Sequence, residues 1–189
     1  MQAATGTPGL IGGGTGRRPL RRIAALAVLP AALCALGAFQ VPANAATGYI
    51  GDNILRNIET GRCLDSNASG AVYTMPCSLP VKSNQYQLWE PQLVFRGSSD
   101  VVIVKNVATQ RCLTLNGSLA GVHTESCDSG HSDQKWSAKG SGWDKINLEI
   151  TYARGRGGFI SVDLDSNRQG NAYASEYNGS GFQRWKFGY

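Results

Sequence analysis

Gln87-Leu88-Trp89 returns as Gln134-Lys135-Trp136 and again as Gln183-Arg184-Trp185. The three glutamines are separated by 47 and 49 residues. A Gln-x-Trp motif at a nearly fixed spacing indicates one supersecondary unit present three times, and such a repeat governs the interpretation of the rest of the chain.

Other segments keep the same register. Residues 56–63 resemble residues 105–112, and residues 72–77 resemble 122–127 and, more faintly, 172–177. Several matching segments in register cannot be explained as the chance recurrence of one tripeptide. We place the three copies at about residues 50–98, 99–143 and 144–189 of a single domain that covers 46–189.

Residues 1–45 are predicted to be a signal peptide. Four arginines precede the apolar run 23–39, and Ala43-Asn44-Ala45 offers a cleavage site between small residues, which is the layout of a secretory leader. A membrane anchor is the alternative, but no charge closely follows the run to stop transfer. We expect a secreted, extracellular protein with no stable membrane anchor.

The predicted leader also changes the charge balance. The chain has 18 Lys and Arg against 13 Asp and Glu, and the leader holds four of the basic residues and no acidic one. The remaining chain has 14 basic and 13 acidic residues, a net charge of +1. A nearly neutral chain without a basic run gives no electrostatic reason to expect binding to nucleic acid or to an anionic membrane.

Four cysteines remain beyond the leader. Cys63 lies 14 residues before Cys77, and Cys112 lies 15 residues before Cys127. An even number in an exported chain predicts disulfides, and although four cysteines allow three pairings, equivalent positions in the copies favour Cys63–Cys77 and Cys112–Cys127. A zinc site is the alternative, but the spacings do not fit one, and we expect no metal and no cofactor.

The alternation pattern predicts an all-β domain. Short β-branched segments such as 101–105, 112–115 and 159–162 are separated by Gly, Asn and Ser, and no stretch shows a 3.6-residue apolar period. Three units are too few for a propeller, and an open solenoid would need polar end caps. Closure about a three-fold axis remains, with Trp89, Trp136 and Trp185 as structural core residues.

These motifs together identify a resemblance. A Gln-x-Trp at the end of each of three copies, with cysteines 14 or 15 residues apart, resembles the ricin B-chain-like (R-type) lectins and the carbohydrate-binding modules beside some secreted glycosidases. The resemblance covers about residues 50–189. It implies a β-trefoil with little or no helix and up to three shallow sugar sites, one in each copy.

The resemblance also implies where the sugar sites lie. In the family, an Asp two residues after the first Cys accepts hydrogen bonds from adjacent sugar hydroxyls, and an ionised carboxylate offers several lone pairs for this purpose. Asp65 and Asp165 occupy this position in copies one and three, whereas copy two has Thr114. We therefore expect sites in copies one and three.

The aromatic platform of the family is displaced in this chain. The usual position has Met75, Glu125 and Ser175, but Tyr73 and Tyr173 lie two residues earlier, on the same face of a strand. The family also favours an Asn before the Gln of Gln-x-Trp, which is absent here. The predicted sites therefore add a nearby asparagine and the motif glutamine, which we expect to bond the backbone or orient a polar neighbour: Asn84 and Gln87 in copy one, Asn178 and Gln183 in copy three.

Each of these residues also has a purely structural interpretation. Asp65 and Asp165 precede Ser-Asn and could bond their own backbone as turn residues. Tyr73 and Tyr173 could be ordinary exposed strand aromatics. Trp143, within the insertion 139–145, could contact a partner or fold back against its own hairpin.

We expect a non-catalytic, monomeric protein that binds a glycan or polysaccharide. The sequence has no nucleophile elbow, metalloprotease motif or P-loop, and equivalent aspartates on different copies would be too far apart to cooperate. The alternative is a secreted β-trefoil that binds a protein, as an inhibitor or scaffold, with degenerate sugar sites.

Overall fold

Twelve β-strands form the regular structure of the chain, in a computed structural model that describes residues 51–117, 121–154 and 158–188. The predicted signal peptide, 1–45, and residues 46–50 lie outside these described residues. The strands are β1 (Asn53–Asn57), β2 (Cys63–Ser66), β3 (Val72–Met75), β4 (Leu88–Phe95), β5 (Asp100–Asn106), β6 (Arg111–Asn116), β7 (Gly121–Ser126), β8 (Trp136–Gly142), β9 (Lys145–Arg154), β10 (Gly158–Ser166), β11 (Ala172–Glu176) and β12 (Trp185–Phe187).

The helical segments in this part of the chain are three single 3₁₀ turns. They are η1 (Gln85–Gln87), η2 (Ser132–Gln134) and η3 (Gly181–Gln183), and each ends on the glutamine of a Gln-x-Trp motif. Among the described residues no helix is long and apolar enough to cross a bilayer.

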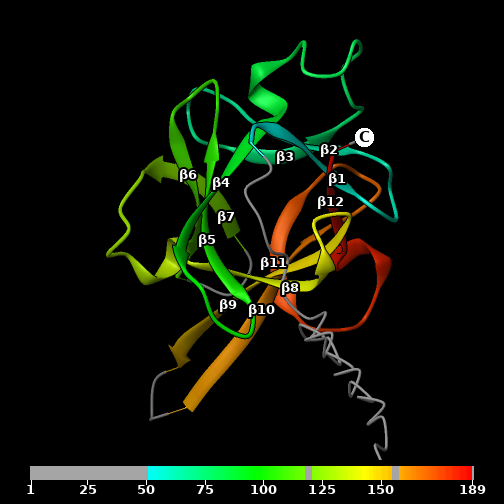
Figure 1. Cartoon of the computed structure of the whole chain (residues 1–189). Coiled ribbons are helices and arrows are strands. Elements are labelled where there is room, and N and C mark those ends of the chain that lie inside the picture. The colour runs from blue at the N-terminus through cyan, green and yellow to red at the C-terminus, as the bar shows by residue number, and fades with distance from the viewer. Residues whose placement is uncertain (1–50, 118–120, 155–157, 189) are drawn as a thin grey trace, which may run out of the picture. The chain divides into compact units, whose positions relative to one another are not determined.

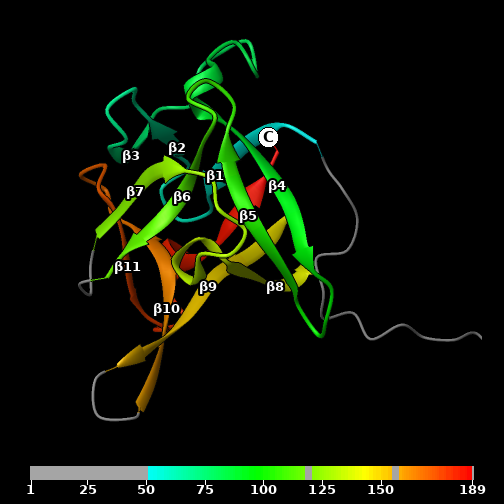
Figure 2. The same cartoon turned by 90° about the vertical axis from the view of Figure 1, so that its left-hand side faces the viewer.

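Six strands close into a barrel. Antiparallel pairing runs from β12 to β1, β4, β5, β8 and β9 and returns to β12. Closure leaves no unpaired edge among these strands. Figure 1 labels these strands, and in Figure 2 the barrel strands β4, β5 and β8 lie to the right of the hairpin strands β2, β3, β7 and β11.

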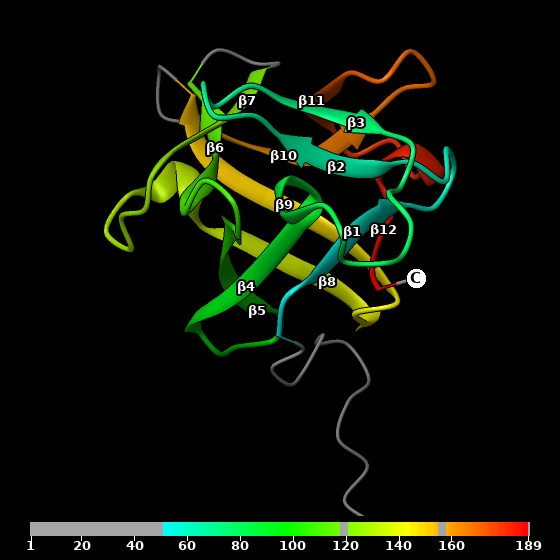
Figure 3. The ribbon, with the colours of Figure 1, turned by 90° about the horizontal axis from the view of Figure 1, so that it is seen from above.

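Three hairpins cap one end of the barrel. They are β2–β3, β6–β7 and β10–β11, one from each group of four strands. Their edges meet in a ring, because Ala71 bridges His123, Gly121 pairs with Tyr173, and Tyr73 bridges Asn171. Seen from above, the three hairpins lie side by side (Figure 3). A six-stranded barrel with a three-hairpin cap is a β-trefoil, so the predicted fold is confirmed.

The three tryptophans of the repeated motif lie in one core. Trp89, Trp136 and Trp185 have no exposed surface and belong to a single apolar cluster. Each indole N–H donates a 2.9 Å hydrogen bond to a leucine carbonyl on the cap hairpin of its own copy, so all three buried indole donors have a partner. The carbonyls belong to Leu64, Leu113 and Leu164.

Two buried asparagines explain the repeated segments 56–63 and 105–112. Asn57 accepts from the backbone N–H of Thr60 and donates to the carbonyl of Phe182, 2.7 Å away. Asn106 repeats this arrangement with Thr109 and the carbonyl of Tyr86, at 2.8 Å. Each side chain closes its own turn and also ties its copy to the neighbouring one.

Copy three lacks such an asparagine and has a longer hairpin instead. In copies one and two the residue just before the asparagine pairs with a neighbouring strand, Arg56 with Lys186 and Lys105 with Glu90. In copy three the equivalent residue is Glu149, which pairs with Ser137. The next residue is Ile150, which is buried and cannot close a turn. β9 and β10 therefore continue for 10 and 9 residues, against 5 and 4 in β1 and β2, and project beyond the other strands (Figure 1).

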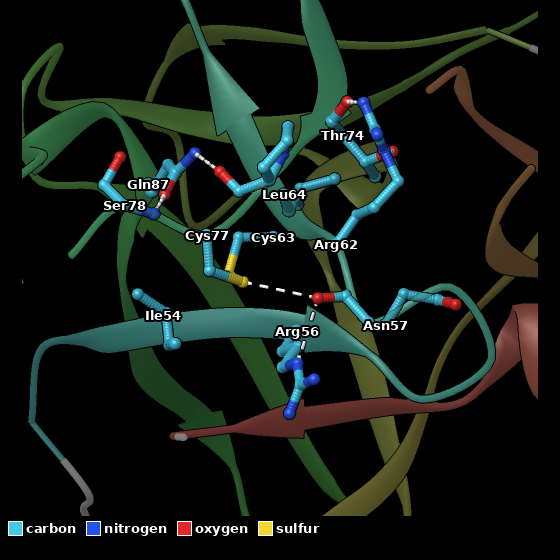
Figure 4. Close-up of a disulfide and its surroundings, with 12 residues drawn as sticks. Ile54, Arg56, Asn57, Arg62, Cys63, Leu64, Thr74, Cys77, Ser78 and Gln87 are labelled. Atoms are coloured by element: carbon cyan, nitrogen blue, oxygen red, sulfur yellow. Dashed lines mark hydrogen bonds between the residues drawn. A yellow bond between two sulfur atoms is a disulfide. The ribbon is translucent and has the colours of Figure 1, made fainter. Parts of the chain in front are cut away.

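Both disulfides join cysteines within one copy. Cys63 bonds Cys77 and Cys112 bonds Cys127, with Cα atoms 5.0 and 4.9 Å apart, which confirms the pairing inferred from the repeat. In Figure 4 the first disulfide lies between β1 and the Gln87 amide. Each bond fixes the end of a cap hairpin to its first strand.

Trp143 folds back onto the protein. It is 9% exposed and its ring meets Phe187 edge-on, with ring centroids 5.3 Å apart. The insertion 139–145 is therefore a hairpin held by its own tryptophan, and Trp143 is not available as a contact for a partner.

Candidate functional site

The predicted carboxylate and aromatic residues lie directly opposite one another on the cap hairpins. Asp65 on β2 pairs with Tyr73 on β3, and Asp165 on β10 pairs with Tyr173 on β11. Directly opposed residues in an antiparallel pair present their side chains on the same face. In both copies the backbone register therefore brings an acid and a tyrosine together.

In copy one this pair lines an open hollow of about 300 Å³. Asn84, the N-cap of η1, and the exposed Tyr86 form the opposite wall. The Asn84 amide Nδ2 lies 3.5 Å from Asp65 Oδ2. The hollow therefore combines one carboxylate, the side-chain amides of Asn67 and Asn84, and two phenol rings.

The environment of Asp65 tunes its carboxylate. Burial raises the pKa of Asp65, and hydrogen bonds with Gln87, Tyr73 and Asn84 oppose that rise. The pKa of Tyr73 is also raised, first by burial and then by the negative charge of Asp65. The charged carboxylate is thus held by donors at the floor of the hollow, with the tyrosine hydroxyl kept protonated beside it.

Such a site can bind a polyhydroxylated ring. An ionised carboxylate accepts hydrogen bonds from hydroxyl groups on adjacent carbons, and an amide both donates and accepts. The faces of aromatic rings cover apolar C–H groups while their hydroxyls remain in water. The side chains of this hollow match those requirements.

Copy three has the same pair in a more closed state. Asp165 is 2% exposed, and both of its oxygens already accept 2.7 Å hydrogen bonds, from the Ser166 N–H and from Ser175 Oγ. Burial and the charge of Asp165 raise the pKa of Tyr173. Asn178 does not contact Asp165 but accepts from the Ser180 N–H within its own turn. The bond to Ser166 is the kind of local backbone contact that the structural interpretation of Asp165 predicted.

The motif glutamines lie below the surface. Gln87 accepts from the Ser78 N–H at 2.9 Å and donates to the Pro76 carbonyl at 3.1 Å (Figure 4). Gln183 accepts from the Asn178 N–H and donates to Ser175 Oγ, both at 2.8 Å. Both glutamines are buried, so they can position the aspartates but not contact a ligand. Gln87 hydrogen-bonds the Asp65 carboxylate, and Gln183 donates to Ser175, which in turn donates to Asp165.

Copy two has different chemistry at the equivalent place. Thr114 is buried and donates to the Cys112 carbonyl at 2.9 Å, so its hydroxyl does not face a ligand. Glu125, across the hairpin, lies 3.5 Å from His123 and 3.7 Å from His131. Among the described residues no cluster of His, Cys, Asp and Glu is arranged to hold a metal ion.

Comparison with known proteins agrees with this geometry. A family model described as the ricin-type beta-trefoil lectin domain matches residues 52–185. The chain belongs to this family. The search of curated proteins found no match.

Two solved structures share the fold of this chain. The designed three-fold symmetric protein ThreeFoil is 19% identical, with a TM-score of 0.55 over 74% of this chain and 99% of its own. SeviL, in a structure bound to the asialo-GM1 saccharide, is 16% identical, with a TM-score of 0.51 over 72% of this chain and 94% of its own. At these identities the likeness establishes the fold of the lectin domain.

The lectin domain holds one further unusual acid, in copy three. Asp163 occupies the place of the first cysteine in copy three, and Tyr177 that of the second. Burial, followed by the charge of Glu149, raises the pKa of Asp163 to about 6. Lys139 forms an ion pair with Glu149 beside it. The repeat spacing alone could have indicated this position, because a charged residue stands where its equivalents are buried cysteines.

Proposed function

We propose that this lectin domain is a secreted, non-catalytic protein that binds a neutral glycan, principally through the hollow of copy one. The observation that carries the proposal is the grouping of Asp65, Tyr73, Asn84 and Tyr86 around one open hollow. Family membership supports a carbohydrate ligand, and the two disulfides are compatible with an extracellular location. We further propose that the protein acts as a monomer without a stable membrane anchor or cofactor.

Copy three is proposed as a weaker site. Tyr173 supplies the platform, but the Asp165 carboxylate must exchange its bond with Ser175 before it can accept from a sugar hydroxyl. In copy one the Asn84 amide lies 3.5 Å from Asp65, a weaker bond than the 2.7 Å bond from Ser175 to Asp165, so less free energy is lost when a sugar hydroxyl replaces it. The two sites therefore differ in strength although their positions are equivalent.

Substitution of Asp65 tests the proposal directly. We expect Asp65→Asn to lower affinity at least about tenfold for any glycan that the wild type selects on a glycan array, since a charged acceptor is lost. Asp144→Ala, which removes an exposed carboxylate on the hairpin of Trp143, is the matched control and should bind normally. Unchanged affinity in folded Asp65→Asn would remove copy one as the principal site.

A protein partner is the second candidate function, and one surface favours it. Leu93, Val94 and Phe95 are consecutive and exposed at the end of β4. Adjacent exposed apolar side chains commonly mark interaction sites. If the folded protein binds no glycan on an array, this alternative is favoured. Selective binding that Asp65→Asn abolishes would favour the carbohydrate-binding function.

A further inference from the structure

The β9–β10 hairpin carries a large apolar side chain that the fold does not need. Phe159 on β10 is 78% exposed and pairs with Ala153 in the part of the hairpin that extends beyond the other strands. The hairpins of copies one and two end before this point, so nothing equivalent exists there. An exposed phenyl ring in such an extension contributes little to the core, but this one also lines a hollow, where its face can contact a ligand.

The extended part of the β9–β10 hairpin and residues of copy two together line a hollow. This space of about 480 Å³, here called the hairpin hollow, is larger than the hollow of copy one. Thr151, Tyr152 and Phe159 line it from the hairpin, and Ser132 and Asp133 line it from η2. Spaces of this size suit small ligands.

The polar groups of the hairpin hollow are incompletely used by the protein. The described contact of the Asp133 carboxylate is with Ser132 Oγ at 3.3 Å, and Asp133 is only partly buried. The Tyr152 hydroxyl is buried, so this residue offers the hollow part of its ring rather than its hydroxyl. Thr151, by contrast, already bonds Ser161 at 2.7 Å.

We propose that the hairpin hollow is a separate binding site for a neutral sugar unit, between copy two and the β9–β10 hairpin. Phe159 would cover the apolar face of the ring, and Asp133 would accept hydrogen bonds from its hydroxyl groups. The Asp133 charge disfavours uronic and sialic units, because no cation is among the residues that line the hollow. This inference rests on the proposed function, since it assumes a glycan ligand.

The proposed site places a binding position beside copy two, although the cap hairpin of copy two has no carboxylate at the position of Asp65. Thr114 is buried and bonded to Cys112, so the position equivalent to Asp65 cannot take part. The hairpin hollow instead takes its acid, Asp133, from the position that Tyr86 occupies in the hollow of copy one. Its ring, Phe159, comes from the β9–β10 hairpin of copy three, which the resemblance does not imply.

The test counts bound sugars in variants that lack the other sites. The probes are the tetrasaccharides of glucose, xylose and N-acetylglucosamine and the asialo-GM1 saccharide, measured by native mass spectrometry. The double variant Asp65→Asn/Asp165→Asn should still bind one copy of a probe that the wild type binds. Addition of Phe159→Ala should lower that remaining affinity about tenfold. Addition of Phe95→Ala, which removes another exposed phenyl ring, is the control and should not.

Titration of the wild type avoids dependence on the folding of the double variant. Backbone amide signals of Ser132, Asp133 and Thr151 should shift on addition of the probe, with a concentration dependence separate from that of Tyr73. Absence of these shifts, or a double variant that binds nothing while the wild type binds, would overturn the inference and leave the site of copy one intact. Failure of the wild type to bind any probe would overturn the proposed function and this inference with it.

Discussion

Asp65 and Asp165 show how neighbours decide what an equivalent residue can do. Both follow a buried position on the first strand of a cap hairpin and face a tyrosine across it. Two residues beyond the tyrosine, on the same strand, copy one has Met75 and copy three has Ser175, whose hydroxyl donates a 2.7 Å bond to Asp165. The thioether of Met75 cannot donate such a bond, so Asp65 keeps the longer 3.5 Å contact with Asn84 and lines an open hollow.

The raised pKa of Asp65 predicts the pH dependence of binding. The carboxylate must be ionised to accept from sugar hydroxyls, and burial favours its neutral form. Affinity should therefore be full at neutral pH and begin to fall, on acidification, at a higher pH than an ordinary aspartate would give. Affinities measured between about pH 3.5 and 7 check this, with Asp65→Asn as a variant whose weaker binding should lack the same inflection. A wild-type profile that is flat down to the ordinary pKa of aspartate would contradict it.

Asp163 should make stability depend on pH in the opposite sense from a salt-bridged acid. Its pKa is about 6 in the folded protein and near the ordinary value when unfolded, so the unfolded state releases its proton first as the pH rises. The free energy of unfolding should then fall between about pH 4 and 6, by at most about 3 kcal/mol. Urea unfolding of the wild type and Asp163→Asn across this range isolates the effect, because other acids cancel in the difference.

The difference in the free energy of unfolding between Asp163→Asn and the wild type should grow as the pH rises. Asp163→Asn should resemble the wild type near pH 4 and be more stable near pH 8, since the neutral amide avoids the cost of a buried charge beside Glu149. A difference between the two proteins that stays constant with pH would show that Asp163 does not titrate in this way.

At the scale of strands and hairpins, the disulfide pairing followed from equivalent positions in the copies. Asp65 was implied by the resemblance to the lectins and Tyr73 by alternation along one strand, while the register that places them opposite each other comes from the structure. The closed state of Asp165 could not be predicted, because it depends on the rotamer of Ser175 and on its bond with Gln183. Local spacing fixes which residues face each other, whereas tertiary packing decides which of them keep free lone pairs.

The register of β10 and β11 predicts that a third disulfide can be installed. Asp163 pairs with Ser175, as Cys63 pairs with Met75 and Cys112 with Glu125, and Tyr177 stands two residues further on, as Cys77 and Cys127 do. Asp163→Cys/Tyr177→Cys should therefore oxidise spontaneously and raise the free energy of unfolding by about 3 kcal/mol, since the closed loop resembles the other two. Removal of the buried Asp163 charge adds to this gain.

Thiol titration and thermal unfolding check the third disulfide. The oxidised double variant should show no free thiol and a melting temperature about 5–10 °C higher. Each single cysteine variant is a control for the loss of the native side chain. A double variant that retains two free thiols under oxidising conditions would show that copy three does not place these positions as the other copies do.

At the scale of the whole molecule, three-fold closure followed from the repeat, but its imperfection did not. The Gln-x-Trp period predicted a common core for Trp89, Trp136 and Trp185, which all lie in one apolar cluster. The long β9–β10 hairpin follows from Ile150 at the place of Asn57 and Asn106, a difference visible only once the strands are aligned by pairing. Departures from symmetry depend on long-range register, which a single sequence does not display.

Placement of weak sites on one rigid body predicts avidity. Sites in different copies point in different directions around the three-fold axis, so an insoluble polysaccharide can engage more than one of them, while a soluble oligosaccharide engages one. Once one site is bound, the effective concentration at the next is high, and retention exceeds either single affinity.

Loss of the copy-one site by Asp65→Asn should therefore reduce, by about tenfold or more, the retention of the protein on an insoluble polysaccharide that the wild type binds. Affinity of the remaining sites for the matching soluble tetrasaccharide should stay unchanged, as measured by depletion isotherms and native mass spectrometry. Retention that falls only in proportion to the number of sites removed would mean that each molecule uses one site at a time.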